Sequence, residues 1–260
     1  MKKIYIRICL FIIASSQAQT IQDSLYVWKA GQLVIKQSIK PADMDSITFK
    51  RPAVNLPHVT ICNQVWATKN LDVATYSDGT PILQATNLTD WANLTVGAWC
   101  YFNNDPANNT VYGKLYNWYA VAGIYDAASL IDPTLRKNIA PTGWHVPTDS
   151  EWSTLINCLD PTANGGDNTN VAGGALKETG TTHWISPNTG ATNSIGFTGL
   201  PGGYRNSGGT NAIGSQGQWW SSSEYSSTNA WVRILKCNNG DATRNNLNKL
   251  AGLSVRCIKN

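Results

Sequence analysis

The sequence predicts an α+β fold of small twisted antiparallel sheets, two helices and long loops, preceded by a small β-hairpin unit. Three observations lead to this prediction. Two segments carry apolar residues at helical spacing, several short β-prone runs lie between Gly-, Asn- and Ser-rich turns, and 11 Trp and 22 Gly accompany only 14% charged residues. Low charge with many aromatic residues is typical of a packed, loop-rich domain rather than of a disordered chain.

Each predicted helix has one apolar face. The first lies within 112–122, and its apolar positions are Leu115, Trp118, Tyr119 and Ala122, at i, i+3, i+4 and i+7. The second lies within 147–159, where Thr148 and Glu151 have the spacing of a capping box. Its buried stripe is expected to consist of Trp152, Leu155, Ile156 and Leu159. Both helices are expected to be scaffold.

Short strands are predicted in both parts of the chain. In the unit at 19–50, β-prone runs on either side of Ala30 and Gly31 predict a hairpin, and a third short strand is expected at 46–50. A linker at 51–58 separates this unit from one continuous domain at 59–260. Strands of that domain are predicted within 195–205, 218–223, 230–235 and 252–258.

The first 18 residues have the pattern of a secretory signal peptide. After a basic start, an apolar run extends from Ile8 to Ala14, and small residues follow at Ser16 and Ala18. The run has about half of the roughly 20 residues that a membrane-spanning helix needs. Cleavage is therefore expected after Ala18, with no membrane span in the mature chain and a secreted or cell-surface localisation.

The charge of the mature chain argues against a nucleic-acid partner. Removal of the leader takes three basic residues and no acidic one, so Lys plus Arg falls from 20 to 17 against 16 Asp plus Glu. Nucleic-acid binding requires a basic face that contacts several phosphates. The sequence contains no such cluster of Lys and Arg.

Several segments, taken in order, resemble one protein family. They are Gly143-Trp-His-Val-Pro-Thr-Asp-Ser-Glu-Trp, Leu200-Pro-Gly-Gly-Tyr-Arg-Asn, Trp219-Trp-Ser-Ser-Ser-Glu and Gly252-Leu-Ser-Val-Arg-Cys. Together they are similar to the Fibrobacter succinogenes major paralogous domain, a family of exported bacterial proteins, from about Val59 to the C-terminus. More distantly, the same blocks resemble the formylglycine-generating-enzyme and C-type-lectin-like folds. This resemblance implies a mixed fold in which long loops carry any site.

Five cysteines follow the leader, namely Cys62, Cys100, Cys158, Cys237 and Cys257. Exported chains meet oxidising conditions, so pairing is expected, and the odd number leaves at least one unpaired. In the resembled family the cysteines of the Gly97-Ala-Trp-Cys-Tyr block and of the terminal Ser-Val-Arg-Cys strand recur, which implies a disulfide between Cys100 and Cys257. Pairing of Cys237 with Cys257 is the alternative.

Catalysis, metal ions and cofactors are not expected. A formylglycine-generating oxidase needs a reactive cysteine pair near its C-terminus, whereas Cys237 and Cys257 stand far apart in sequence. A calcium site needs clustered carboxylates, and Asp241 is a single acid in a predicted turn. Glycoside hydrolysis needs two facing carboxylates. Among only three glutamates, a pair of Glu178 and Glu224 stays open.

The segment 218–249 is the first place to look for a ligand, because it combines aromatic rings, amides and arginines that suit sugars or protein surfaces. The candidate ligand-binding residues are Trp219, Trp220, Glu224, Tyr225, Trp231, Arg233, Asn238, Asn239, Arg244, Asn245 and Asn246. In the alternative interpretation, the tryptophans are core residues and the asparagines hold turns. The sequence favours a binding module for an extracellular glycan or protein. A structural cell-surface component is the alternative, and a cryptic enzyme of formylglycine-generating-enzyme-like fold comes third.

Overall fold

The computed structural model describes residues 23–29, 32–39 and 55–260. The predicted leader, the turn at 30–31, the third short strand at 46–50 and most of the predicted linker lie outside these residues. The chain divides into two compact units, Met1–Arg51 and Pro52–Asn260, each of which is described by itself.

In the first unit, β1 (Asp23–Lys29) and β2 (Gln32–Ile39) pair antiparallel. The register joins Asp23 to Ile39 and Lys29 to Gln32, with an irregularity after Val27. These are the two strands of the hairpin that the sequence predicts.

The second unit combines small sheets with short helices, which confirms the predicted α+β class. Its strands are β3 (His58–Ile61), β4 (Gln64–Ala67), β5 (Leu83–Gln84), β6 (Ala98–Cys100), β7 (Leu115–Tyr116), β8 (Trp144–His145), β9 (Tyr204–Asn206), β10 (Gly209–Asn211), β11 (Gln216–Glu224), β12 (Asn229–Lys236), β13 (Ala242–Asn248) and β14 (Ile258–Lys259). Its α-helices are α1 (Leu88–Ala92), α2 (Ala107–Tyr112), α3 (Trp118–Val121), α4 (Ala127–Ile131), α5 (Asp149–Leu159) and α6 (Ala172–Leu176). Within the described ranges, none of the helices has the length and apolar character needed to cross a membrane.

The strands form several small sheets. β11, β12 and β13 make a three-stranded antiparallel sheet, called the central sheet below. A four-stranded sheet has the order β3-β4-β14-β8, so the last strand of the chain lies between β4 and β8. A third sheet has the order β5-β6-β7, and β9 and β10 form a hairpin. Only β5 and β6 pair parallel among the named strands of this unit.

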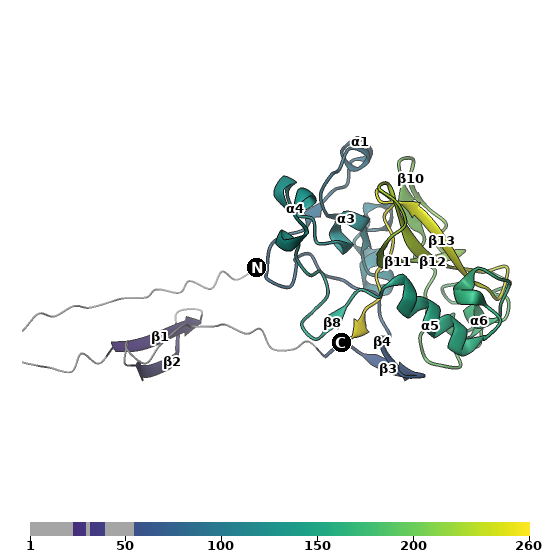
Figure 1. Ribbon diagram of the computed structural model, residues 1–260, viewed down its shortest axis with the longest axis horizontal. Coiled ribbons are helices and arrows are strands. Elements are labelled where there is room, and N and C mark those ends of the chain that lie inside the picture. Colours follow the sequence, from purple (N-terminus) through teal and green to yellow (C-terminus); the bar gives the residue numbers. More distant parts are fainter. Residues whose placement is uncertain (1–22, 30–31, 40–54) are drawn as a thin grey trace, which may run out of the picture. The chain divides into compact units, whose positions relative to one another are not determined.

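The central sheet lies between two buried clusters. Side chains alternate across a strand, so the neighbours Trp219 and Trp220 on β11 point to opposite faces. Trp219 packs in a cluster with Trp152 of α5, and Trp220 packs in another with Trp118 of α3. Figure 1 shows α5 and α6 beside this sheet.

Helix α5 forms as the sequence predicts. The hydroxyl of Thr148 accepts a hydrogen bond from the backbone N–H of Glu151, and the Glu151 carboxylate accepts one from the backbone N–H of Thr148. Trp152, Leu155 and Ile156 are buried. The capping box is therefore confirmed, and the apolar stripe of the helix is part of the core.

The continuous helix predicted within 112–122 is wrong. Helix α2 ends before Gly113, which adopts a φ of 73° that favours glycine. Leu115 and Tyr116 then form strand β7, and Asn117 caps the separate helix α3 by accepting a hydrogen bond from the Ala120 N–H. Of the apolar residues at helical spacing, Leu115 and Trp118 are buried and Tyr119 and Ala122 are partly buried, and they come from a strand and a short helix rather than from one helix.

The predicted strands at 218–223 and 230–235 correspond to β11 and β12. Most of 195–205 is irregular, with β9 only at its end. Within 252–258, the chain makes single bridges from Leu253 to Tyr116 and from Ser254 to Trp219 before β14 begins.

The disulfide predicted between Cys100 and Cys257 is wrong. The structure joins Cys62 to Cys158, with their Cα atoms 6.8 Å apart, and leaves Cys100, Cys237 and Cys257 as free thiols. Cys100 and Cys257 are both buried, but they belong to different core clusters. The Cys62–Cys158 bond ties the loop between β3 and β4 to the end of α5, and Cys237 does not pair with Cys257.

Candidate functional site

The structure places the first two sequence candidates, Trp219 and Trp220, in the core. Both are buried on opposite faces of the central sheet. The indole N–H of Trp219 donates to Oδ1 of Asn70 over 2.9 Å, and that of Trp220 donates to the carbonyl of Tyr116 over 2.8 Å. A ligand reaches neither ring, so the alternative core interpretation holds for these two residues.

Arg233 and Arg244 face one another across β12 and β13, and both hold Asp149 at the start of α5. Arg233 is 1% exposed, and its Nη1 lies 2.7 Å from Oδ1 of Asp149. Arg244 Nη2 lies 2.7 Å from Oδ2 of the same carboxylate. Burial works to raise the pKa of Asp149, but the hydrogen bonds from the two arginines outweigh it and hold the pKa below its usual value. Both arginines therefore connect the sheet to the helix that covers it.

Trp231 and Tyr225 form a small aromatic surface next to Arg244. Their ring centroids are 4.7 Å apart in an edge-to-face arrangement, and the Arg244 guanidinium lies 3.5 Å from the Trp231 ring centroid. Tyr225 is 53% exposed. Asn246, the cross-strand partner of Trp231, accepts a hydrogen bond from the Asn229 side chain. Four of the candidate residues are thus brought together.

The remaining candidates lie apart from this surface. Glu224 is exposed and pairs with Lys249 at 3.2 Å. Asn238 and Asn239 lie in the turn between β12 and β13, where the Asn239 side chain accepts from the Asp241 N–H. Asn245 is exposed on β13.

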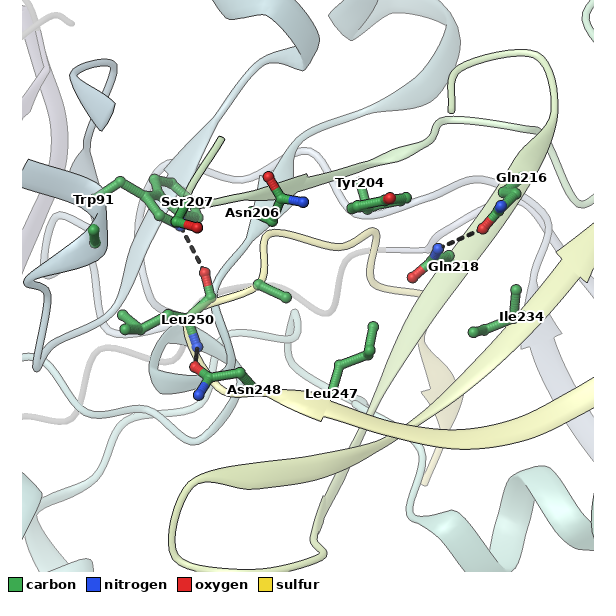
Figure 2. Close-up of a pocket in the computed structure, with 12 residues that line it drawn as sticks. Trp91, Tyr204, Asn206, Ser207, Gln216, Gln218, Ile234, Leu247, Asn248 and Leu250 are labelled. Carbon is green, nitrogen blue, oxygen red and sulfur yellow. Dashed lines mark hydrogen bonds between the residues drawn. The ribbon is translucent and has the colours of Figure 1, made fainter. Parts of the chain in front are cut away.

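A pocket of about 610 Å³ opens over the other face of the central sheet, and none of its lining residues is among the candidates named from the sequence. Segments that are far apart in the sequence supply its walls, from α1, β9, β11, β12 and the end of β13 with the residues that follow it, and Figure 2 shows most of their side chains. Its twelve lining residues, called the amide pocket below, are Trp91, Ala92, Tyr204, Asn206, Ser207, Gln216, Gln218, Ile234, Leu247, Asn248, Leu250 and Ala251. None of them carries a charge.

The walls of the amide pocket are held together by backbone hydrogen bonds. The N–H of Gly203 donates to the Gln216 carbonyl over 2.9 Å, which fastens β9 to β11. Arg205 and Gly252 exchange two backbone hydrogen bonds of 2.8 and 2.9 Å, which fastens β9 to the segment after β13. Alternation along β9 then turns Tyr204 and Asn206 toward the pocket and Arg205 away from it. The pocket is therefore largely preformed.

The end of the amide pocket is closed by Trp91 of α1. Its indole N–H donates to the Leu250 carbonyl over 2.6 Å, and the Arg205 guanidinium lies 4.5 Å from its ring centroid. Arg205 also donates to the carbonyls of Thr86 and Asn87. These contacts fix α1, so Trp91 presents a rigid apolar edge.

Three side-chain amides of the pocket use their oxygen within the protein and leave their NH₂ group available. Asn206 Oδ1 accepts from the Gly208 N–H, Asn248 Oδ1 from the Leu250 N–H, and Gln216 Oε1 from Gln218. Among the described residues, the three NH₂ groups and the hydroxyls of Tyr204 and Ser207 have no partner. The pocket thus offers a ligand several hydrogen-bond donors.

Gln218 contributes the complementary group. Its Nε2 donates to Gln216 Oε1 over 2.8 Å, whereas its Oε1 is buried and has no hydrogen-bond partner within 55–260. The side chain is 4% exposed, and in Figure 2 its oxygen points toward the space enclosed by the labelled side chains. An unpaired buried acceptor is unfavourable, so this atom is suited to a donor that a ligand supplies.

The three glutamates that catalysis would need each have a local partner. Glu151 lies 2.9 Å from His145 and completes the capping box, Glu178 lies 2.8 Å from His183, and Glu224 pairs with Lys249. The described part of the chain contains no group of three or more His, Cys, Asp or Glu side chains arranged to hold a metal ion.

Most residues of the amide pocket were missed from the sequence. The usable signal is the i, i+2 spacing of Gln216, Gln218 and Trp220 on β11, which places the two glutamines on the same face as the Trp220 ring. Nothing in the sequence links these positions to Trp91 or to Tyr204, because the wall segments meet only in the fold.

The family model of the Fibrobacter succinogenes major domain matches residues 59–259, so the amide pocket and the central sheet lie within the matched region. No curated protein matches the chain, and no solved structure matches it. The matched region contains all of the sequence blocks that resemble this family. The chain therefore belongs to the Fibrobacter succinogenes major domain family.

Proposed function

We propose that this chain is an exported binding module that takes a neutral glycan into the amide pocket and leaves it chemically unchanged. One observation carries the proposal. Amide and hydroxyl groups without a protein partner lie beside aromatic and aliphatic side chains in a preformed, uncharged pocket. This combination suits a sugar, whose hydroxyl and ring oxygens accept hydrogen bonds and whose C–H groups pack on apolar surface.

The size and charge of the amide pocket favour a glycan over other ligand classes. A volume of about 610 Å³ falls within the range of roughly 300–1,000 Å³ for pockets that bury small ligands. A folded protein partner would need a wider and flatter surface. A nucleotide or another strongly charged ligand would need cationic or anionic side chains, and the lining has none.

The lining also supports binding without catalysis. General acid–base chemistry at a sugar needs carboxyl or imidazole groups within hydrogen-bond reach of the reacting atoms. The twelve lining residues include no Asp, Glu, His or Cys. The proposal therefore assigns the amide pocket to recognition alone.

A secreted or cell-surface location is part of the proposal. The first 18 residues have the pattern of a signal peptide, and disulfides such as Cys62–Cys158 persist in oxidising compartments outside the cytoplasm. Mass spectrometry of the protein from its host is expected to find a chain that begins near Gln19 outside the cytoplasm. An intact Met1 in the mature protein would contradict export by this leader.

Binding is best tested with a glycan array followed by calorimetry on two matched variants. Asn248 and Asn245 are both exposed on β13, and each accepts one local backbone N–H, over 2.9 and 2.8 Å. Only Asn248 lines the amide pocket. Asn248→Ala is expected to weaken binding of the array hit by about tenfold, the effect of one hydrogen bond of about 1.4 kcal/mol, and Asn245→Ala to leave it unchanged.

Two results would contradict the proposal. If Asn245→Ala removed binding and Asn248→Ala did not, the ligand would lie outside the amide pocket. Silence on the array together with self-association of the chain would favour a structural component of the cell surface.

A further inference from the structure

We infer that the sugar bound in the amide pocket carries an acetamido group, and that Gln218 accepts the hydrogen bond from its N–H. The inference rests on the proposed function, because it names the substituent that the same pocket recognises. It follows from three kinds of group that line the pocket. These are a buried acceptor, an aliphatic wall and a set of amide donors.

The buried acceptor is Oε1 of Gln218. The Gln216 side chain holds the other end of this amide at 2.8 Å, so the orientation of Gln218 is fixed within the protein. Its Oε1 has no partner in the described part of the chain and is closed to water. An unpaired buried acceptor is unfavourable, so this atom suits a donor that enters the pocket together with an apolar group.

The aliphatic wall lies next to that acceptor. Ile234 is the cross-strand partner of Gln218, and paired residues on one face of a sheet have neighbouring side chains. Ile234 is buried, and Leu247 and Ala251 are partly buried beside it in the same cluster. Hydroxyl groups gain nothing from such a wall, but a methyl group does.

The third kind of group is a set of side-chain amide donors. The unpaired NH₂ groups of Asn206, Gln216 and Asn248 suit a carbonyl oxygen as well as sugar hydroxyls. An acetamido group unites one N–H donor, one carbonyl acceptor and one methyl group within a few bonds. It therefore matches the acceptor, the donors and the wall together, whereas a plain hydroxyl in its place could serve the acceptor and the donors but would leave the aliphatic wall without an apolar partner.

A short peptide also carries N–H, C=O and methyl groups, and it is the main competing ligand. A peptide segment presents its backbone in an extended line and usually pairs with an exposed strand edge. The amide pocket instead opens over the face of the central sheet, between β9 and the segment after β13. A compact ring with one acetamido substituent fits this enclosed shape better.

The test compares three ligands on the wild-type chain by calorimetry. N,N′-diacetylchitobiose and cellobiose differ only in having acetamido groups or hydroxyls at the same positions, and N-acetyl-alanine methylamide presents the same groups without a sugar. Diacetylchitobiose is expected to bind about tenfold or more tightly than cellobiose, the effect of one additional buried hydrogen bond. The peptide analogue is expected to bind more weakly than either disaccharide.

The variant Gln218→Met keeps the length of the side chain and removes the acceptor. It is expected to lower the ratio of the affinity for diacetylchitobiose to the affinity for cellobiose to about one. The ratio of the two affinities is compared within one protein, so a general loss of stability does not imitate the result.

The outcomes separate this inference from the proposed function. Equal binding of both disaccharides, lost in Asn248→Ala, would leave glycan binding in place and overturn the acetamido assignment. An unchanged ratio in Gln218→Met would overturn the role of Gln218. Preference for the peptide analogue would overturn the inference in favour of a peptide ligand, and failure of every glycan on the array would overturn the proposed function itself.

Discussion

Arg233 on β12 and Asp149 at the start of α5 form an ion pair of 2.7 Å that fastens the central sheet to the helix covering it. The same carboxylate holds Arg244 on β13 at 2.7 Å. Arg233 also donates to the Ser153 hydroxyl over 2.9 Å, one turn further along α5. One acidic residue at a helix start thus anchors two neighbouring strands.

We expect Asp149→Asn to destabilise the protein by about 3 kcal/mol or more, because it leaves the buried Arg233 without its charged partner. Denaturation in urea measures the loss. Asp167→Asn is the matched control, since Asp167 pairs with Arg244 at 3.1 Å but its side chain is 43% exposed. The control is expected to cost less than about 1 kcal/mol. Similar losses in the two variants would contradict the anchoring role of Asp149.

The stability of the protein is expected to fall in acid partly through Asp149. Its pKa is lower in the folded protein than its usual value, because the hydrogen bonds from the arginines outweigh the effect of burial. A carboxylate of this kind contributes stability that is complete above its unfolded pKa of about 3.9 and is lost as the pH falls through the folded pKa. Urea denaturation at several pH values between about 6 and 3 should therefore show that the free energy of unfolding falls more steeply for wild type than for Asp149→Asn. If the free energy of unfolding fell equally with pH in both proteins, the pKa of Asp149 would not change on folding.

The Cys62–Cys158 disulfide is expected to stabilise the folded protein. It joins positions 96 residues apart, for which the chain-entropy model gives about 4 to 5 kcal/mol and measured bonds typically about 2 to 4. The variant with Cys62→Ser and Cys158→Ser should unfold at a lower urea concentration, and Cys237→Ser should not. A peptide map of unreduced protein that linked Cys100 to Cys257 would contradict this pairing.

The three free thiols should differ in reactivity. Burial raises the pKa of Cys257 to about 12 and also raises the pKa of Cys100, and the thiolate is the reactive form. Cys237 is only partly buried. Iodoacetamide at pH 8 should therefore label Cys237 in the native protein and all three thiols only after unfolding, as read by peptide mass. Labelling of Cys257 in the native protein at the same rate as Cys237 would mean that the buried segment around Cys257 opens readily.

The elements that the sequence predicts well are those with local causes. Helix α5 starts where Thr148 and Glu151 cap each other, three residues apart, and its apolar stripe repeats at helical spacing. The helix predicted within 112–122 shows the limit of such reasoning. Its apolar spacing is compatible with a strand followed by a short helix: Gly113, with positive φ, ends α2 before the strand, and Asn117 stands between the strand and α3.

The candidate site was harder to predict because its chemistry depends on which face of a strand a residue occupies. Arg233, Arg244 and Trp219 lie on the face of the central sheet that α5 covers, so their side chains contact the helix rather than a ligand. Strand β13 is rich in asparagine and resembles a turn, yet it pairs with β12 over its whole length. The amide pocket joins residues from α1 to the segment after β13, and such distant neighbours leave no spacing to detect.

The most direct test of the account follows the side-chain amide signals in ¹H–¹⁵N NMR spectra while diacetylchitobiose is added. Binding in the amide pocket predicts that the NH₂ signals of Asn206, Gln216, Gln218 and Asn248 shift together with one dissociation constant. The signals of Asn238 and Asn245, which lie outside the pocket, should stay in place. Binding that shifts Asn238 and Asn245 while the four pocket amides remain unchanged would contradict the account.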